Sequence, residues 1–282
     1  MKIQELLKLG YELLKKVNIE TYMIDSQLIL CKVLNVDKLF IITNRNLQVG
    51  DNEVKEYIRL IKLREKKMPV KYILQSAEFM GIDFFVKEGV LIPRMDTEIL
   101  VEEAIDEIKA NRYKTVCDLC CGSGAIGISL AHYIEDINII CYDISDIALE
   151  VTEKNINMLQ FHDRIEVYES DLLSEATKSN RKFDIIVSNP PYIKEDVIDT
   201  LMEDVKDYEP FIALSGGEDG LDFYRKIVLQ SKGVLNHGGS LVFEIGYDQR
   251  EAVMNIMEEN EFKNIQFIKD LSGNDRVVKG RF

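Results

Sequence analysis

The sequence predicts an α/β fold: a doubly wound, mostly parallel seven-stranded sheet, preceded by a small N-terminal helical bundle and a β-hairpin connector. From about residue 93, short apolar runs rich in β-branched residues alternate with stretches of helical periodicity. Such alternation is typical of a parallel sheet with helices on both faces. Residues 1–75 show helical periodicity alone, so we expect a separate module there.

The N-terminal module, residues 1–75, is expected to be a helical bundle. Apolar residues recur at three- and four-residue spacing with Lys and Glu between them, which indicates amphipathic helices. Asp25 and Asp51 are placed to cap the second helix and a later one. Pro69 ends the pattern and permits a short turn over Val70–Leu74.

The remaining chain divides into a linker, residues 76–92, and a predicted catalytic domain, residues 93–282. Two short apolar runs around Gly81 indicate a β-hairpin in the linker. The expected strands of the domain are Thr115–Leu119, Asn138–Ile144, Arg164–Tyr168, Phe183–Ser188, Ser240–Ile245, Asn264–Ile268 and Arg276–Gly280. Helical periodicity fits residues 97–110, 125–134, 146–160, 219–232 and 248–260. The last two strands follow each other closely, so we expect an antiparallel pair at one edge.

Charge and composition narrow the function classes. The net charge of −14 argues against nucleic-acid binding through the overall field, because phosphate contacts need Lys and Arg clusters. The charge is divided: residues 1–75 carry +5 and residues 76–282 carry −19. No segment has the length and apolarity of a membrane helix, and the N-terminus has no targeting pattern. With five cysteines, an odd number, we expect a reduced, cytoplasmic protein.

A glycine-rich segment, Asp118–Gly127, follows one predicted strand and opens a helix. Its glycines let the backbone approach a ligand, and the helix N-terminus presents free N–H groups. Asp143 ends the next strand, where a carboxylate can accept hydrogen bonds from both ribose hydroxyls. Asp171-Leu172 after the third strand fits adenine recognition. The pattern also satisfies GxGxxG, so it predicts an adenosyl cofactor and leaves S-adenosylmethionine and a nicotinamide dinucleotide both open.

A second motif, Asn189-Pro190-Pro191-Tyr192, ends a buried strand. Two prolines force the backbone out of the sheet as a rigid loop, at the strand edge where ligands bind. The Asn189 side-chain oxygen and the Pro190 carbonyl can each accept one N–H of a planar NH₂ group. The Tyr192 ring can pack against the flat group that carries it. Such positioning would aim the nitrogen lone pair at a methyl sulfonium.

These motifs resemble those of amino-methyltransferases that act on planar NH₂ groups in adenine or glutamine. Among them, the chain resembles the peptide chain release factor glutamine methyltransferases, the HemK/PrmC family. The segments that carry the resemblance occur in the family's order: Ile92–Glu98 resembles IPRPDTE, Glu209–Arg225 resembles EP…AL.GG.DGL..YR, and Phe243–Gly246 and Lys269–Val278 resemble the closing segments. The resemblance spans roughly residues 70–282, and the helical N-terminus fits the family layout.

The resemblance implies a class I S-adenosylmethionine methyltransferase fold and a set of site residues. Asn189, Pro190, Pro191 and Tyr192 would hold the substrate glutamine of the Gly-Gly-Gln loop of class 1 release factors, with Asn189, Pro190 and Tyr192 catalytic. The cofactor S-adenosylmethionine would be held by Cys120, Cys121, Gly122, Ser123, Gly124, Asp143, Asp171, Leu172 and Asn189. No metal is implied. Two departures stand out: Cys120-Cys121 replaces the usual Gly-Thr, and Met95 replaces the second proline of IPRPDTE.

Other interpretations stay open at this stage. A nucleic-acid adenine methyltransferase shares Asn-Pro-Pro-Tyr but needs a basic groove, and a nicotinamide-dependent enzyme shares the glycine loop. Cys117 and Cys120 lack a second pair that would complete a zinc site. Arg94 and Glu98 could neighbour the cofactor or cap the helix near Thr97, and Glu244 could line the pocket. The acidic run 195–209 is expected to be a solvated loop beside the site, and the helical module is expected to dock the release factor.

Overall fold

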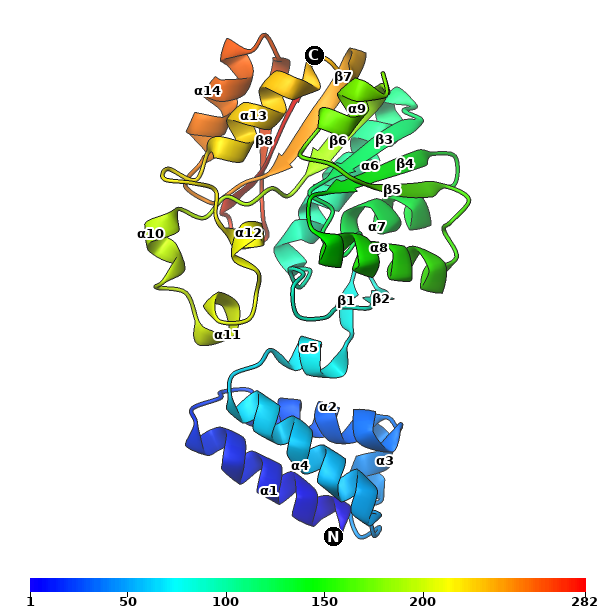
Figure 1. The fold of residues 1–282 in the computed structure, drawn as a ribbon, viewed down its shortest axis with the longest axis vertical. Helices are drawn as coiled ribbons and strands as arrows, with labels where there is room; N and C mark the ends of the chain where they lie inside the picture. The colour runs from blue at the N-terminus through cyan, green and yellow to red at the C-terminus, as the bar shows by residue number, and fades with distance from the viewer. The chain divides into compact units, whose positions relative to one another are not determined.

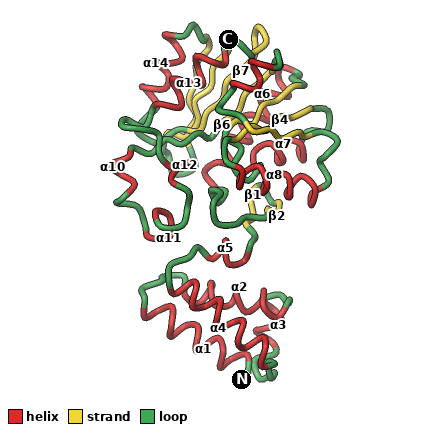
Figure 2. Tube along the Cα trace, in the orientation of Figure 1, coloured by secondary structure: helices red, strands yellow, loops and turns green.

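The structure, a computed structural model, describes residues 1–282, which divide into two compact units. The helical unit comprises Met1–Ser76 together with Met202–Tyr208, and the α/β unit comprises Ala77–Leu201 and Glu209–Phe282. Figures 1 and 2 show that the helical unit contains helices alone, whereas the other unit contains a sheet between helices. No helix is long and apolar enough to cross a membrane.

The helical unit forms as its periodicity predicts. Its helices are α1 (Ile3–Lys16), α2 (Tyr22–Leu34), α3 (Lys38–Thr43), α4 (Asp51–Glu65) and α5 (Val70–Leu74). Their apolar faces share one core, which includes Leu6, Ile29 and Tyr57. A side chain at Gly10 of α1 would collide with the hydroxyl of Tyr57 on α4, so a residue without Cβ lets these helices pack closely.

Both predicted caps in this unit are wrong. Asp25 lies inside α2, where it is buried and forms an ion pair with Arg64 of α4 at 2.7 Å. Asp51 is the first residue of α4, and Gly50 occupies the cap position. An acidic residue near the start of a helical pattern is compatible with a cap, with the first turn or with a tertiary ion pair, and only the fold distinguishes them.

The segment Met202–Tyr208 groups with the helical unit, although it is far away in sequence. It contains α11 (Glu203–Lys206). The Tyr208 hydroxyl donates a hydrogen bond to the carbonyl of Lys66 at 2.6 Å, and Glu203 lies 3.8 Å from the ammonium group of Lys67. No local pattern in the sequence indicates these contacts.

The predicted β-hairpin connector is present as β1 (Ala77–Phe79) and β2 (Ile82–Phe84), paired antiparallel. Its turn residues Met80 and Gly81 both have positive φ, 51° and 71°, which matches the right-handed twist of the strands. The Met80 N–H donates to the side chain of Glu98 at 2.6 Å. Glu98 therefore holds the hairpin turn, and it forms no ion pair with Arg94.

The α/β unit is built on a seven-stranded sheet in the order β5-β4-β3-β6-β7-β9-β8. The first five strands in that order are parallel, and β9 pairs antiparallel with both neighbours. The predicted fold class and antiparallel edge are confirmed. The strands are β3 (Thr115–Leu119), β4 (Asn138–Asp143), β5 (Ile165–Glu169), β6 (Phe183–Ser188), β7 (Leu235–Glu244), β8 (Lys263–Lys269) and β9 (Asp275–Arg281).

Helices cover both faces of this sheet (Figure 1). Alternate residues of one strand enter different cores: Ile185 and Val187 of β6 belong to one cluster and Ile186 to the other. This is why the strand is apolar throughout and does not alternate. The larger helices are α6 (Glu98–Asn111), α7 (Ala125–Tyr133), α8 (Asp146–Leu159), α13 (Asp222–Ser231) and α14 (Arg250–Glu259), with η1 (Met95–Thr97) preceding α6.

The predicted solvated loop at 195–209 contains short helices. They are α10 (Glu195–Ile198) and α11, and α12 (Phe211–Leu214) follows the region; α9 (Ser174–Lys178) lies earlier, between β5 and β6. The last residue of the acidic run, Glu209, is buried, and both its carboxyl oxygens lie 2.6 Å from the guanidinium of Arg94. The expectation of solvation is therefore wrong for Glu209, because Arg94 compensates its charge.

Candidate functional site

A cavity of about 440 Å³ lies at the carboxyl ends of the parallel strands. Its volume is in the range of small-molecule sites. Nine of the twelve predicted site residues line it: Cys120, Cys121, Gly122, Ser123, Asp143, Asp171, Leu172, Asn189 and Pro191. Three do not line it, namely Gly124, Pro190 and Tyr192. The two motifs, Asp118–Gly127 and Asn189–Tyr192, are far apart in sequence and thus meet at one cavity because β3 and β6 are neighbours in the sheet.

The glycine loop connects β3 to α7 through three left-handed residues. Cys120, Gly122 and Gly124 have φ of 59°, 58° and 75°. Gly124 is the residue before α7, and a Cβ there would lie 2.9 Å from Thr152. Its role in the structure is therefore to let the loop pack against α8. At Gly122 a Cβ would meet only Val90, at 3.8 Å, so this glycine leaves space on the cavity side.

Cys120 adopts the backbone conformation that the family's glycine would adopt without strain. A side chain in the left-handed region costs of the order of 1 kcal/mol, yet the path of the loop is kept. Cys120 lines the cavity, and burial raises the pKa of its thiol well above the ordinary value. At neutral pH this thiol is uncharged, so the substitution adds a small apolar group to the cavity wall.

Asp118 of β3 fixes the start of α7 through a hydrogen bond. Its Oδ2 accepts a hydrogen bond from the Gly127 N–H at 2.8 Å. A Cβ at Gly127 would lie 3.0 Å from this oxygen, so the third glycine of the GxGxxG pattern allows close packing of helix on strand. Asp118 is fully buried, and burial raises the pKa of its carboxyl to about 7.

Asp143, at the end of β4, is held in place by the loop it faces. Its two carboxyl oxygens accept hydrogen bonds from the Gly122 N–H at 2.9 Å and the Ser145 N–H at 3.0 Å. Each carboxylate oxygen has two lone pairs, so both retain capacity for a ribose hydroxyl. Burial raises the pKa of Asp143, and the N–H donors of Ser145 and Gly122 oppose that shift.

Asp171 and Leu172 follow β5 and complete this side of the cavity. Leu172 is buried with φ of 50°, whereas Asp171 is exposed. The Ser170 hydroxyl donates to the Leu172 carbonyl at 2.6 Å. This bond orders the turn that brings both residues to the cavity wall.

Asn189 follows β6 directly and lines the other side of the cavity. Its Nδ2 donates a hydrogen bond to the hydroxyl oxygen of Thr97 at 3.3 Å. The amide orientation is thereby set so that Oδ1 is the acceptor available to a ligand. Just before it, the Ser188 hydroxyl donates to the Leu119 carbonyl at 2.7 Å, which ties the end of β6 to the end of β3.

Residues 214–220 and Gln249 hold the backbone of the Asn-Pro-Pro-Tyr loop. The Ile193 N–H donates to the Leu214 carbonyl, and the Ile193 carbonyl accepts from the Gly216 N–H, which forms a parallel bridge. The Gln249 side chain donates to the Tyr192 carbonyl at 2.9 Å. A Cβ at Gly220 would lie 2.5 Å from that same carbonyl oxygen. Gly216 and Gly220 of the Gly-Gly-Glu-Asp-Gly segment thus let it approach the loop closely.

Sequence reasoning missed several residues around the cavity. Thr97 and Gln249 hold the loop, and Phe223 and Lys226 of α13 join the lining. Arg94, which the sequence predicts as a possible neighbour of the cofactor, does line the cavity, and it fixes Glu209 beside Pro210 and Ile212 of the wall. Thr97 lies in the IPRPDTE-like segment, and Pro210, Ile212 and Phe223 lie in the Glu209–Arg225 stretch, whereas Lys226 and Gln249 lie outside both; single-sequence patterns give no reason for their contacts.

Comparisons with known proteins agree with this geometry. The family model of the PrmC N-terminal domain matches residues 5–74, and that of the methyltransferase small domain matches residues 95–206. A release factor glutamine methyltransferase of Clostridium botulinum is 55% identical over 281 residues, 100% of this chain and 99% of that protein. Its counterpart in Clostridium acetobutylicum is 52% identical over 278 residues, 99% of this chain and 98% of that protein.

The chain belongs to the release factor glutamine methyltransferase family.

The family predicted from the motifs is therefore confirmed, and with it the methyltransferase class. Among solved structures, the T. thermophilus 16S rRNA N2 G1207 methyltransferase in complex with AdoMet and guanosine is 18% identical, with a TM-score of 0.52. The match covers 73% of this chain and 49% of that one. At this identity it shows a shared fold.

Proposed function

We propose that the chain transfers the methyl group of S-adenosylmethionine to the side-chain amide nitrogen of the Gly-Gly-Gln glutamine in class 1 peptide chain release factors. The observation that carries the proposal is the 55% identity over the whole chain to a release factor glutamine methyltransferase. The cavity supports it, because a nucleotide-type loop and an amide-accepting loop face the same space.

S-adenosylmethionine fits the residues on the β3–β4–β5 side of the cavity. Asp143 would accept the ribose hydroxyls, Asp171 and Leu172 would flank the adenine, and the loop from Cys120 to Gly124 would approach the methionine portion. When bound, the cofactor supplies an electrophilic methyl group on sulfur. The methyltransferase family match favours this cofactor over a nicotinamide dinucleotide.

Asn189 and Pro190 would orient the substrate amide. With Nδ2 engaged by Thr97, the Asn189 Oδ1 accepts one amide N–H, and the Pro190 carbonyl accepts the other. Two acceptors on one NH₂ group raise electron density on nitrogen and fix its direction of attack. Tyr192 directs its hydroxyl to Glu244 and does not line the cavity, so in this proposal its ring would border the flat amide from the edge of the loop.

The direct test is methylation of a purified release factor with labelled S-adenosylmethionine, followed by peptide mass spectrometry. We expect label on the Gly-Gly-Gln glutamine, and none on a release factor in which that glutamine is replaced by alanine. Duplex DNA serves as the competing acceptor, because adenine methyltransferases share Asn-Pro-Pro-Tyr. Label on adenine and none on the glutamine would contradict the proposal.

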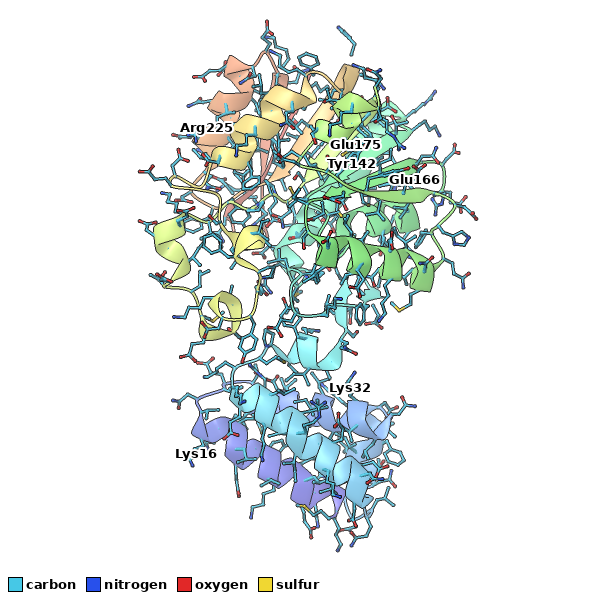
Figure 3. The ribbon with its side chains drawn as sticks, viewed as in Figure 1. Lys16, Lys32, Tyr142, Glu166, Glu175 and Arg225 are labelled. Carbon is cyan, nitrogen blue, oxygen red and sulfur yellow. The ribbon has the colours of Figure 1, made fainter.

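The helical unit would dock the release factor, as its basic character suggests. Residues 1–75 carry a net +5, and the exposed Lys16 on α1 and Lys32 on α2 are among these charges (Figure 3). Replacing Lys8 and Lys16 of α1 with glutamate in the full chain should raise KM for the whole release factor several-fold. KM for a short Gly-Gly-Gln peptide should not change. An equal rise for both substrates would contradict docking by this unit.

A further inference from the structure

Glu244 is a buried acid directly behind the Asn-Pro-Pro-Tyr loop. It is the last residue of β7 and is only 1% exposed. The Tyr192 hydroxyl donates a hydrogen bond to Glu244 Oε1 at 3.2 Å. The Tyr224 hydroxyl of α13 donates to the Glu244 main-chain carbonyl at 2.9 Å, so the end of the strand is fixed independently of the carboxyl group.

Thr97 connects this carboxyl group to Asn189. Thr97 is buried and accepts the hydrogen bond of Asn189 Nδ2 at 3.3 Å, and its hydroxyl opposes the rise in the pKa of the Glu244 carboxyl that burial causes. Two side chains of the substrate loop, Asn189 and Tyr192, therefore lead to one acid.

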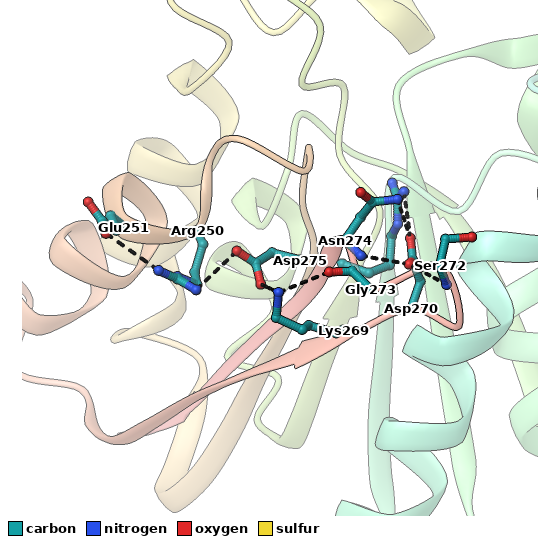
Figure 4. A network of polar contacts seen from close by, with 9 residues as sticks. Arg250, Glu251, Lys269, Asp270, Ser272, Gly273, Asn274 and Asp275 are labelled. Atoms are coloured by element: carbon teal, nitrogen blue, oxygen red, sulfur yellow. Dashed lines mark hydrogen bonds and ion pairs between the residues drawn. The ribbon is translucent and has the colours of Figure 1, made fainter.

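No ion pair neutralises Glu244. Arg276 on β9 attracts the charged form of Glu244, but its guanidinium is paired with Asp96 and Asp270, 3.1 Å from each. Asp270 in turn accepts hydrogen bonds that order the β8–β9 turn, from the N–H groups of Ser272 and Asn274 (Figure 4). Glu244 Oε2 has no hydrogen-bond partner, and burial raises the pKa of this carboxyl.

An acid buried without an ion pair is costly to a fold. The polar groups around its carboxyl are Tyr192 of the substrate loop and Thr97, which holds Asn189 of that loop. A residue kept only for stability at this position would be apolar, as are its neighbours Phe243 and Ile245, both fully buried.

We propose that Glu244 is a positioning residue for methyl transfer, which orders Tyr192 directly and Asn189 through Thr97. This inference rests on the proposed function and adds a residue to it. Glu244 does not touch the substrate; it fixes the two side chains that do. Its removal should therefore lower kcat at an intact cofactor site.

The test measures kcat and KM on a Gly-Gly-Gln peptide, and the Kd of S-adenosylhomocysteine, for the full chain and four variants. We expect Glu244→Ala to lower kcat at least tenfold with Kd within twofold of the wild type. Glu244→Gln, whose Oε1 still accepts from Tyr192, should stay within about fivefold of wild-type kcat. Thr97→Val should also lower kcat, and it tests the pathway without touching Glu244 if the alanine variant fails to fold.

The matched control is Glu107→Ala. Glu107 lies on α6, pairs with Lys279 and Arg281 of β9, and is likewise largely buried. Its loss should lower the melting temperature and leave kcat within twofold. The inference is overturned if Glu244→Ala keeps kcat within twofold, if kcat and cofactor affinity fall together, or if Glu244→Gln is as impaired as Glu244→Ala. A wild-type enzyme that leaves the peptide unmethylated would instead overturn the proposed function.

Discussion

The two loops that face the cavity are held in place in different ways. The glycine loop is shaped by its own backbone, with three left-handed residues in five positions, and by the side chains of Asp118 and Asp143 and of Thr152 and Asn155 on α8, which bond its main chain. The Asn-Pro-Pro-Tyr loop takes its rigidity from elsewhere: Thr97, Gly220, Glu244 and Gln249 all lie at least 28 residues away from it.

In the proposed function, the glycine loop binds the cofactor, whereas the Asn-Pro-Pro-Tyr loop positions the substrate amide. The contacts that hold the glycine loop come from β4 and α8, on the proposed cofactor side of the cavity. A loop braced by four remote segments keeps its geometry only while each brace stays in place, so changes far away in sequence should impair transfer before they impair cofactor binding. Variants in each loop test whether cofactor binding and methyl transfer can be impaired separately.

The largest effect is expected from Gly220→Ala. A Cβ there would lie 2.5 Å from the Tyr192 carbonyl oxygen and 2.7 Å from the Gln249 side-chain nitrogen. Displacement of the loop by a fraction of an ångström should lower kcat by about 100-fold, with S-adenosylhomocysteine affinity nearly unchanged.

Gly81→Ala is the matched control for that variant. Gly81 has a similar φ, 71° against 78°, and an added Cβ would meet nothing within 4 Å. It should cost about 1 kcal/mol of stability and leave kcat unchanged. Equal kinetic effects of the two variants would show that backbone strain, and not the brace, is responsible.

Asp143→Asn should impair cofactor binding and not methyl transfer. Loss of the charge weakens the hydrogen bonds to the ribose, and we expect cofactor affinity to fall by roughly 10- to 100-fold. At saturating cofactor, kcat should recover to near the wild-type value. Isothermal titration with S-adenosylhomocysteine beside steady-state kinetics separates the two quantities, and a low kcat at saturation would show that Asp143 also shapes the substrate side.

Asp118 predicts a pH dependence of stability. Its folded-state pKa of about 7 lies above its ordinary value of 3.8, so the folded chain binds the proton more tightly than the unfolded chain. The contribution of Asp118 to the free energy of unfolding should therefore be largest below about pH 4 and fall by up to about 1.4 kcal/mol per pH unit towards pH 7. Asp118→Asn should flatten that slope in urea titrations at several pH values; an unchanged slope would contradict the assignment.

The smallest effect is expected from Cys120→Gly. Glycine relieves the left-handed backbone at φ 59°, but it removes a packed thiol and gives the unfolded chain more freedom. We expect the free energy of unfolding and the cofactor Kd to change by less than about 1 kcal/mol each. A larger loss of affinity would show that the Cys120 side chain contacts the cofactor.

The sequence predicts well whatever depends on neighbours in the chain. The strands from Thr115 to Ser188, the Val70–Leu74 turn and the Gly81 hairpin are present because periodicity, proline and glycine act locally. Both motifs line one cavity because parallel strands end at one edge. These features needed no knowledge of distant contacts.

What could not be predicted depends on tertiary partners. Asp25 is a buried ion-pair partner of Arg64, Glu209 is buried against Arg94, and Tyr208 joins the helical unit. In each case an acidic or polar segment looks solvent-exposed in the sequence, and one remote cation or carbonyl group changes its environment. The braces of the substrate loop are of the same kind.

The most direct test of the central claim, that one cavity holds the cofactor and the substrate amide on separable loops, is Asn189→Ala measured twice. Methyl transfer to the Gly-Gly-Gln glutamine should fall at least 100-fold, because the amide loses an acceptor that orients it. S-adenosylhomocysteine affinity, measured on the same preparation, should stay within about threefold of the wild type. Equal loss of transfer and cofactor affinity would contradict the account.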